Sequence, residues 1–276
     1  MFTVLTGLRS NPNITIDTKA STTTLVFPRI LEASTTAELQ IWFRGTIADA
    51  NDTSALYRQP FTTGNGTVEY LLSTQFEAED ARRVFPCWDE PLFKANFTVT
   101  LIIPNNVTAV SNMPIDSEAS LVSNGTTKKS VRFKTTPRMS SYLVAWAIGR
   151  FQYIESTDYK MPIRVYFAPD QDPAGMRYTL SVATKTMDFF EAKLGVPYPL
   201  PKLDFIVHTH QLWGYSGMEN WGLITLSSTV VYDMTSSSYS GKQGSTTLTA
   251  HEISHLWFGD IVTMTWWDNI WLNEGL

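Results

Sequence analysis

The hydrophobic periodicity of the sequence changes near residue 155, and this change divides the chain into two parts that must fold differently. Before it, residues 96–101 and 131–134 alternate polar and apolar side chains, which is the pattern of half-buried strands. Residues 39–47 and 142–151 form further β-rich runs bounded by turn residues. No sustained helical spacing occurs before residue 170. The first part is therefore expected to form an antiparallel sandwich or folded sheet.

The second part carries helical spacing. Residues 173–194 place apolar side chains three or four positions apart and stop at Gly195 and Pro197, which predicts a helix. A second helix is expected from about residue 246 to residue 258, with Gly259 at the position of a C-terminal cap. These patterns predict an α+β fold with a β-rich domain at residues 1–155 and a second domain at residues 156–276.

Composition and charge exclude several classes of protein. The 276 residues are 43% hydrophobic and 17% charged, as in a globular protein, and the net charge of −5 comes without any basic tract that would favour nucleic-acid binding. The single cysteine, Cys87, excludes an internal disulfide framework and a cysteine-only metal site. Residues 142–148, the longest apolar stretch, are too few to span a bilayer, and residues 1–25 show no signal-peptide pattern.

Asparagine acceptor sites indicate a cellular compartment. The pattern Asn-x-Ser/Thr, which accepts N-linked sugars, occurs six times in the β-rich part, at Asn13, Asn51, Asn65, Asn96, Asn106 and Asn124. We therefore expect a glycoprotein that is secreted or lies at the extracellular face of the plasma membrane. The alternative is a cytoplasmic protein in which these patterns occur by chance, because the region is rich in Ser and Thr.

Two of the four histidines belong to the motif His251-Glu252-Ile253-Ser254-His255. On a helix, residues four apart share a face, so both imidazoles reach one ion, while Glu252 is offset toward a water on that ion. A zinc ion lowers the pKa of such a water, and a carboxylate then accepts its proton as the water attacks a carbonyl group. The motif therefore supplies two zinc ligands, His251 and His255, and a general base, Glu252.

A third zinc ligand is expected at Glu274, nineteen residues after His255. This distance allows the first helix to end, a loop to turn back and a second helix to bring the carboxylate to the ion. Two histidines and one glutamate are a ligand set of catalytic zinc, which keeps a fourth position open. For the histidine motif alone, the alternative is an amphipathic helix with two surface histidines.

Two further segments carry groups that can pair with an ammonium ion. Glu219 lies in the segment 216–222, where glycines allow a close approach to a ligand. Gln75 and Glu77 lie two residues apart and would face the same side of a strand. For each segment alone, a solvated loop or strand face is the alternative.

Together these segments resemble the M1 family of zinc aminopeptidases. The stretch TQFEA at 74–78, followed by DARRVFPCWDEP at 80–91, is similar to the N-terminal domain signature of that family. GMEN at 217–220 resembles the end of its exopeptidase motif, and HEISH at 251–255 with WLNEG at 271–275 resembles its zinc motif. The likeness runs from about residue 20 to the last residue, and the flanking Trp221-Gly222 is similar to the aminopeptidase N branch.

The resemblance implies a β-rich saddle domain followed by a thermolysin-like zincin domain. It implies an activity that hydrolyses the first bond of peptides with a free N-terminus, with one Zn²⁺ ion as the cofactor. His251, His255 and Glu274 would bind this ion, and Glu252 would be the general base. Peptides are the expected partners, nucleic acid is not, and any membrane attachment would come from segments outside these 276 residues.

The resemblance also assigns the residues that bind the substrate. Glu219 would hold the free α-amino group of the peptide, with Gln75 and Glu77 helping. Backbone groups of Gly217 and Met218 would line the peptide. Because the ammonium group is then fixed at a set distance from the metal, only the first peptide bond reaches it, which distinguishes an exopeptidase from an endopeptidase.

The sequence departs from the family pattern at several positions. Ser216 stands where the family motif usually has its first glycine, and Gly217 where alanine is common. Leu256 replaces the more usual glutamine after the second histidine. The segment before the motif is longer than usual and carries His208 and His210, which we expect to be surface loop residues. These departures concern the first substrate pocket rather than the zinc chemistry.

The family also uses a tyrosine downstream of the third ligand to stabilise the oxyanion, and this chain ends at Leu276 before such a residue. The catalytic domain is therefore expected to be truncated and this chain alone to be inactive. Cys87 matches the cysteine of the family and is expected in the core. Two other classes stay open: a non-catalytic receptor that keeps the fold, and a zincin endopeptidase, which would not need Glu219.

Overall fold

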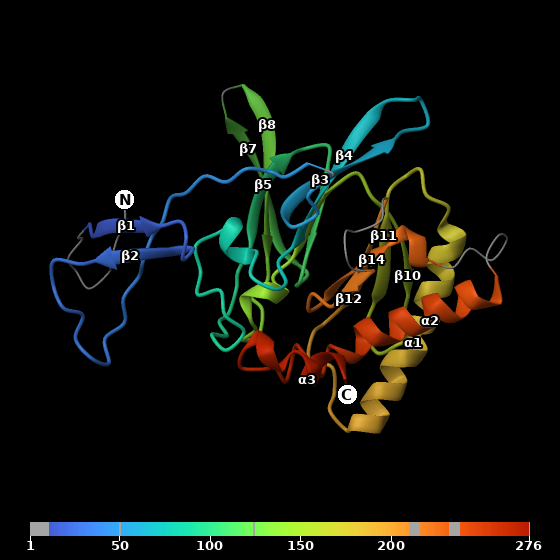
Figure 1. Ribbon diagram of the computed structural model, residues 1–276. Helices are drawn as coiled ribbons and strands as arrows, with labels where there is room; N and C mark the ends of the chain where they lie inside the picture. Colours follow the sequence, from blue (N-terminus) through green and yellow to red (C-terminus); the bar gives the residue numbers. More distant parts are fainter. Residues whose placement is uncertain (1–10, 50, 124, 210–215, 232–237, 276) are drawn as a thin grey trace.

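The computed structural model describes residues 11–49, 51–123, 125–209, 216–231 and 238–275, and Figure 1 shows their arrangement. A hairpin of β1 (Asn13–Asp17) and β2 (Thr22–Val26) lies at one side, apart from the other sheets. The expected strand at residues 39–47 is wrong, because these residues pair with no described segment and leave Trp42 and Phe43 exposed. An apolar pattern makes a strand only where a neighbour shares its backbone hydrogen bonds.

Two antiparallel sheets form the β-rich half of the molecule, with the strand orders β3-β4-β9-β6 and β5-β8-β7. The first contains β3 (Ala55–Thr62), β4 (Val68–Gln75), β9 (Trp146–Gly149) and β6 (Thr108–Ser111). The second contains β5 (Thr100–Pro104), β8 (Thr126–Phe133) and β7 (Ile115–Ser123). Among the described residues, this half holds no α-helix, only the short 3₁₀ helices η1 (Ala81–Arg83) and η2 (Ser141–Leu143). The expected antiparallel, β-rich first half is therefore confirmed.

Two of the expected strands begin later than the sequence pattern indicates. Strand β5 begins at Thr100 because side chains replace part of the backbone pairing before it. Phe97 N–H donates to Thr136 Oγ1 at 2.9 Å, and Asn96 Nδ2 donates to the Thr136 carbonyl at 2.7 Å. The run 142–151 begins in η2 and becomes extended only in β9.

The second half is built on a five-stranded sheet of mixed direction. Its order is β10 (Gln152–Ser156), β11 (Ile163–Phe167), β12 (Leu203–His208), β14 (Leu223–Ser227) and β13 (Gly217–Met218). The three central strands β11, β12 and β14 run parallel, and the outer strands β10 and β13 run antiparallel to their neighbours. With the helices on this sheet, the α+β fold is confirmed. The sheets change between Gly149 and Gln152, and the division at residue 155 stays a prediction.

Helix α1 (Pro173–Leu194) has the bounds that the sequence predicts. Asp172 caps its N-terminus by accepting a hydrogen bond from Ala174 N–H, and Pro173 begins the first turn. Gly195 ends the helix in the left-handed conformation with φ of 67°, which glycine adopts without strain. The helix connects the parallel strands β11 and β12 and packs against β10, β11 and α2.

Helix α2 (Tyr239–Ser254) begins earlier and ends earlier than expected. Ser238 caps it, and the Thr246 and Thr249 hydroxyls donate to carbonyls one turn back, so the Ser- and Thr-rich segment is compatible with a helix. Gly259 is not its cap, because the helix ends at Ser254 and Gly259 lies in a later turn with φ of 138°. The 3₁₀ helices η3 (Ser228–Val230) and η4 (Trp267–Asn269) and the single turn α3 (Trp271–Glu274) complete the elements.

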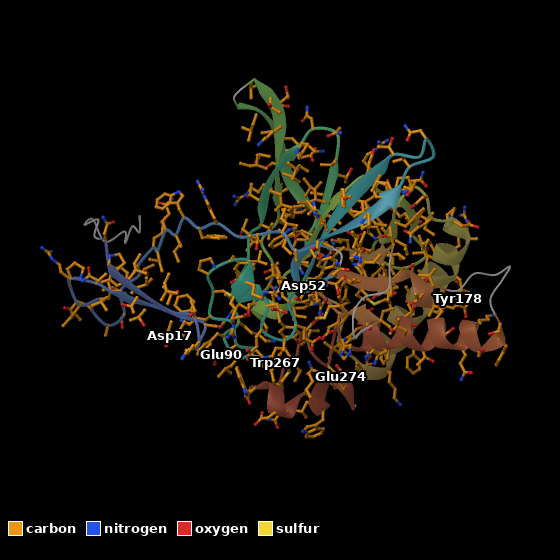
Figure 2. The ribbon with its side chains drawn as sticks, turned by 45° about the horizontal axis from the view of Figure 1, so that its top comes forward. Asp17, Asp52, Glu90, Tyr178, Trp267 and Glu274 are labelled. Carbon is orange, nitrogen blue, oxygen red and sulfur yellow. The ribbon has the colours of Figure 1, made fainter. Side chains whose placement is uncertain are left out.

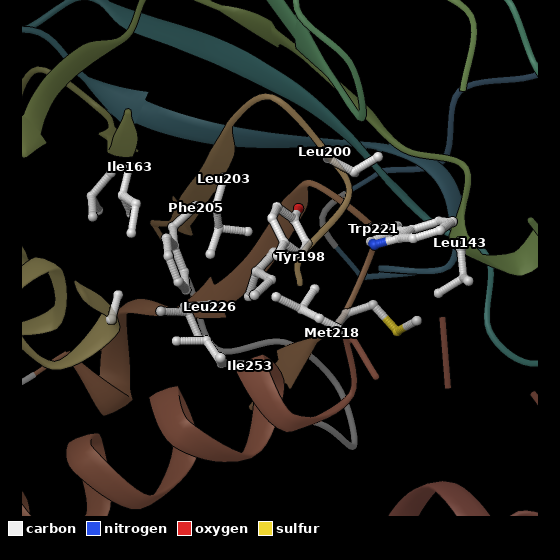
Figure 3. Packing of buried hydrophobic residues seen from close by; sticks show 14 of the residues in the cluster. Leu143, Ile163, Tyr198, Leu200, Leu203, Phe205, Met218, Trp221, Leu226 and Ile253 are labelled. Atoms are coloured by element: carbon white, nitrogen blue, oxygen red, sulfur yellow. The ribbon is translucent and has the colours of Figure 1, made fainter. Parts of the chain in front are cut away.

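The main core joins the two halves of the molecule. Buried side chains of the central strands, including Phe205 and Leu226, pack with Ile253 of α2 and with Leu143 of η2, as Figure 3 shows. Burial of these apolar groups fixes the last turns of α2 against the sheet edge that carries β13. Of the helices in the described part of the chain, none combines the length and the apolar character needed to cross a bilayer.

Candidate functional site

The two histidines of the predicted zinc motif lie side by side at the C-terminal end of α2. Their Nε2 atoms are 3.0 Å apart, with His251 half-buried and His255 fully buried. The Nδ1 atom of His255 lies 3.0 Å from the Phe258 carbonyl, to which an Nδ1–H group donates. That tautomer leaves the lone pair on Nε2, which is the atom that faces His251.

Glu274 reaches both imidazoles from α3. Its Oε2 lies 3.3 Å from His251 Nε2, and its Oε1 lies 3.7 Å from His255 Nε2. The preceding residue, Asn273, is buried and donates from Nδ2 to the hydroxyl of Tyr142 in η2, at 3.4 Å. Figure 2 shows Glu274 and Trp267 at the junction between the β-rich half and α2. The β-rich half thus helps to place the turn that carries Glu274.

The three side chains fit a zinc ion. Their ligand atoms all lie within 4.8 Å of one another, and the three closest separations are 3.0, 3.3 and 3.7 Å. A tetrahedral zinc with ligands at about 2.0–2.1 Å separates its ligand atoms by roughly 3.3 Å. Two imidazoles and a carboxylate are also the ligand types of catalytic zinc. A metal at this position would be held by His251, His255 and Glu274.

Glu252, the expected general base, is buried beside this position. Its carboxylate lies in a second group of close ligand atoms with Glu219 and His255. Burial raises the pKa of Glu252 well above its usual value, and the negative charges of Glu219, Glu274 and Glu77 raise it further. A carboxylate in this environment retains a proton more readily than one in water.

Glu219 lies between strand β13 and a tight turn, almost fully buried at 3% exposure. Its Oε1 atom has no hydrogen-bond partner in the described residues, and burial raises its pKa to about 7, with Glu274 adding to the effect. Gln75 at the end of β4 is also buried, donates from Nε2 to Met218 Sδ at 3.3 Å, and leaves its Oε1 without a described partner. Two buried acceptors are therefore available for a donor from outside the chain.

Glu77 follows β4 and adds a further carboxylate to the site. Burial raises its pKa to about 8, and the charges of Glu219 and Glu274 contribute, while His255 opposes them. The structure thus brings together all the residues that the sequence assigns to this site. Their carboxylates repel one another electrostatically, and a divalent cation or an ammonium group would relieve that repulsion.

A pocket with a volume of about 630 Å³ opens beside this site. The residues that line it come from the second half and are mostly small or polar: Ser216, Thr229, Ser240, Gly241, Gln243, Gly244, Ser245, Thr247, Leu248 and His251. Strand β13 is at the edge of its sheet next to the pocket, so one side of its backbone has no neighbouring strand among the described residues. An extended chain could lie along that edge.

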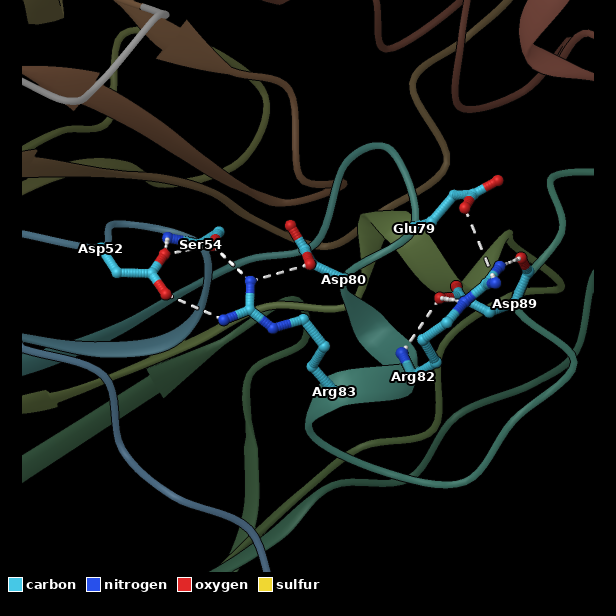
Figure 4. Close-up of polar contacts among 7 residues, drawn as sticks. All are labelled: Asp52, Ser54, Glu79, Asp80, Arg82, Arg83 and Asp89. Atoms are coloured by element: carbon cyan, nitrogen blue, oxygen red, sulfur yellow. Dashed lines mark hydrogen bonds and ion pairs between the residues drawn. The ribbon is translucent and has the colours of Figure 1, made fainter. Parts of the chain in front are cut away.

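The segment 80–91, which resembles the family signature, is held by ion pairs rather than placed in the site (Figure 4). Asp89 is buried and accepts hydrogen bonds through Oδ2 from the backbone N–H and Nε of Arg82, both at 3.0 Å. Its Oδ1 accepts from Ser141 Oγ at 2.7 Å, next to Tyr142. Arg83 pairs on the outside with Asp52 at 2.8 Å. This segment therefore connects the end of β4 with η2.

The structure corrects the expectation for His208. It ends the buried strand β12 with 2% exposure, and its Nδ1 lies 2.7 Å from Gln59 Oε1 in β3, with the Tyr57 hydroxyl also in contact. Burial lowers the pKa of His208 to about 3. The predicted surface loop is wrong here because β12 extends further than its flanking residues suggested, and His210 lies outside the described residues.

Two departures from the family pattern, Leu256 and Ser216, and the matching Cys87 lie within the described residues. Leu256 is fully buried in the core, and Ser216 is exposed at the pocket. Cys87 is partly buried against the core, and burial raises the pKa of its thiol to about 12, with Asp89 contributing. A thiol with this pKa stays protonated at neutral pH and is a poor nucleophile.

Sequence reasoning missed residues that support the site from outside the motifs. Tyr142 is buried, donates its hydroxyl to the Gly259 carbonyl at 3.3 Å and packs edge-on against Trp267, at a ring distance of 5.1 Å. Its partners are mostly backbone or neutral groups from distant segments. No sequence pattern signals such contacts, since they depend on how the two halves meet.

Metallopeptidases typically have this arrangement: a pair of histidines four residues apart, a buried glutamate directly after the first histidine, and a second glutamate downstream. Family models give the same class. The model of the peptidase M1 N-terminal domain matches residues 8–143, and that of the peptidase family M1 domain matches residues 178–276. Together they cover most of the sequence, and the chain belongs to peptidase family M1.

Individual relatives agree with the family models. The alanine/arginine aminopeptidase of Saccharomyces cerevisiae is 40% identical over 256 residues, which are 91% of this chain and 29% of that protein. Aminopeptidase Ey of Gallus gallus is 41% identical over 235 residues, 84% of this chain and 24% of that protein. The S. cerevisiae protein named aminopeptidase 2, mitochondrial, is 39% identical over 257 residues, 92% of this chain and 26% of that protein. The chain thus spans less than a third of the length of these relatives.

Proposed function

We propose that the protein carrying this chain is a zinc-dependent aminopeptidase, which hydrolyses the first peptide bond of substrates with a free N-terminus. The observation that carries this proposal is the position of buried Glu219 beside the group His251, His255 and Glu274. Metal ligation and recognition of an ammonium group are thereby available within one site. The names of the relatives and the family models support the same activity.

The free α-amino group of the substrate would bind at Glu219 and Gln75. Both present a buried oxygen without a partner among the described residues, and an ammonium group has three N–H donors to satisfy them. Glu77 is a further ionisable carboxyl group beside Glu219, and its charged form favours a cation over a neutral, acylated N-terminus. Because these groups lie next to the metal ligands, a bound N-terminus leaves only its own peptide bond near the metal.

Glu252 would move the proton during hydrolysis. Its buried carboxylate accepts a proton from the attacking water and later donates that proton to the nitrogen of the leaving amine. Burial and the carboxylates around Glu252 raise its pKa above the usual value, which makes its carboxylate a stronger base than that of an exposed glutamate. A bound zinc ion would lower the pKa of the attacking water and polarise the substrate carbonyl.

The peptide would lie along the backbone of Gly217 and Met218. Strand β13 is at the sheet edge, so its outer backbone groups are available to an extended substrate. Glycine at 217 leaves no side chain between the strand and Glu252. The residues after the cleaved bond would enter the pocket that is lined by α2 and Ser216.

The compartment of the protein is part of the proposal. Five acceptor asparagines are exposed, namely Asn13, Asn51, Asn65, Asn96 and Asn106, whereas Asn124 lies outside the described residues. This exposure is compatible with glycosylation. One relative is named mitochondrial, however, so the comparisons do not favour the extracellular interpretation over the cytoplasmic alternative.

We expect this chain alone to turn over little substrate. Glu274 sits on a single helical turn, and 44% of its side chain is exposed. A one-turn helix gains little stability of its own, so it holds the third ligand weakly. The activity proposed here therefore concerns the full natural protein.

The experiment that tests the mechanism is hydrolysis of an alanyl anilide by the full natural protein and by its Glu252→Gln variant. We expect kcat to fall by about 10²–10⁴-fold in the variant, the usual contribution of a general acid–base group. Zinc content should be unchanged, because Gln replaces a residue that is not a ligand. Equal activity of the two proteins would refute the role of Glu252.

A further inference from the structure

The residues after Glu219 form a tight turn that joins β13 to β14. Leu223 N–H donates to the Asn220 carbonyl at 2.8 Å, and Gly222, the third residue of the turn, has φ of 83°. This is the geometry of a type II turn, which favours glycine at that position. Glu219 therefore directly precedes a turn whose placement decides where its carboxylate points.

Asn112, at the end of β6 in the other half of the molecule, is bonded to this turn. Its Nδ2 donates to the Trp221 carbonyl at 2.9 Å and to the Leu143 carbonyl at 2.7 Å. Its Oδ1 accepts from Ala145 N–H at 2.8 Å, so a single fully buried amide makes three hydrogen bonds. The approach is close, since a Cβ on residue 222 would lie 2.3 Å from the Asn112 backbone oxygen.

Lys202 holds the same turn from the side of β12. Its buried ammonium donates to the Gly222 carbonyl at 2.6 Å and to the Ser111 carbonyl at 2.7 Å. Asp204 Oδ2 lies 2.9 Å from Lys202 Nζ and balances its charge. A buried lysine bonded to two backbone carbonyls fixes these two segments to each other.

We propose that Asn112 and Lys202 are positioning residues, which fix the turn 220–223 to the β-rich half and so hold Glu219 at the right place for the substrate ammonium group. The inference rests on the proposed function, because it assigns these residues to the binding of the α-amino group. Neither side chain contacts the proposed metal ligands or Glu252 in the described structure. Their loss should therefore weaken recognition of the amine and leave metal binding intact.

The test compares two inhibitors of the full natural protein that differ by one group. Leucine hydroxamate has an α-amino group, and 4-methylpentanohydroxamate has the same skeleton without it. The inhibition constant of 4-methylpentanohydroxamate divided by that of leucine hydroxamate gives a ratio that measures amine recognition alone. The first variant, Asn112→Asp, keeps the size of the side chain and its acceptor but loses the Nδ2 donor to the Trp221 carbonyl. The second variant, Lys202→Met, loses the ammonium group that donates to the Gly222 carbonyl. Each variant is first checked for wild-type zinc content and circular dichroism.

The matched control is Gln59→Leu, which removes the buried hydrogen bond to His208 between the same two halves but away from the turn. We expect both test variants to lower the inhibitor ratio by about 10-fold, since small displacements of a binding group cost this much or more. The inhibitor without an amine should keep its affinity, and Gln59→Leu should keep the wild-type ratio.

The outcomes separate this inference from the proposed function. Equal weakening of both inhibitors, or the same loss of ratio in Gln59→Leu, would overturn the inference, because it would show general loosening of the two halves. A ratio that falls in Glu219→Gln but not in the Asn112 and Lys202 variants would overturn the inference alone. If the wild-type protein binds the two hydroxamates equally, or if Glu219→Gln keeps the wild-type ratio, the proposed function fails and the inference fails with it.

Discussion

The backbone of Gly217 lies so close to the carboxylate of Glu252 that a Cβ atom on residue 217 would fall 2.2 Å from Glu252 Oε1. Replacing Gly217 with alanine must therefore displace the carboxylate. The contacting atoms are the end of a flexible side chain, and alanine is common here in the family that the motifs resemble. We expect Gly217→Ala to lower kcat by about 3- to 10-fold, a small fraction of what a misplaced catalytic group can cost. An unchanged kcat would show that the carboxylate is not used where it lies here.

The metal site gives a second prediction. Glu274→Gln and His251→Ala should each reduce the zinc retained after dialysis against a weak chelator, because each removes one of three ligands. Glu90→Gln is the matched control, since Glu90 is an exposed glutamate of the β-rich half. Zinc per chain, measured by atomic emission, should fall in the two site variants and stay constant in the control. Full zinc retention in both site variants would mean that the ion binds elsewhere.

Burial of His208 gives a prediction about pH. Its pKa is lowered to about 3 in the folded protein, whereas an unfolded histidine titrates near 6.5. Between these values the unfolded state binds a proton that the folded state does not, so stability is lost as the pH falls through this range. The slope contributed by one such histidine is at most about 1.4 kcal/mol per pH unit.

The variant His208→Gln removes this titration, and Tyr57→Phe is its control because the imidazole stays in place. The free energy of unfolding, measured by denaturant from about pH 7 to about pH 4, should fall less steeply in His208→Gln than in the wild type. The control should keep the wild-type slope. Parallel curves for all three proteins would contradict the assigned burial.

The ion pairs of segment 80–91 differ in burial and therefore in expected effect. Asp89→Ala leaves Arg82 and Ser141 without their buried partner, and we expect a loss of about 3–5 kcal/mol in the free energy of unfolding. Asp52→Ala breaks an exposed pair with Arg83 and should cost about 1 kcal/mol or less. Denaturant unfolding of both variants checks this. Equal losses would show that burial does not decide the contribution of these pairs.

The sequence predicted those features that depend on local chemistry. Helix α1 ended where Gly195 indicated, because an N-cap, an apolar stripe and a glycine act within a few residues. The histidine motif and Glu274 were likewise found from spacing alone, and the structure brings them together. Each of these signals is carried by neighbouring residues, whatever the rest of the chain does.

Features that depend on distant partners were not predictable in this way. Residues 39–47 have an apolar pattern but find no neighbouring strand in the described structure. His208 was expected in a surface loop, because its partner Gln59 in β3 is distant in the sequence. Asn112 and Lys202 bond mainly to backbone carbonyls, and a carbonyl has no sequence signature. The grouping of the site residues was predictable from the motifs, whereas their support from the β-rich half was not.

We infer that buried Glu219 beside the metal ligands restricts this site to exopeptidase activity. The most direct measurement is the kcat/KM of the full natural protein on an alanyl anilide and on the same anilide with an acetylated amine. We expect hydrolysis of the free amine and a loss of at least about 10³-fold on acetylation, since acetylation removes the cation and leaves buried acceptors unpaired. Equal hydrolysis of the two substrates, as from an endopeptidase, or hydrolysis of neither, as from a non-catalytic receptor, would contradict it.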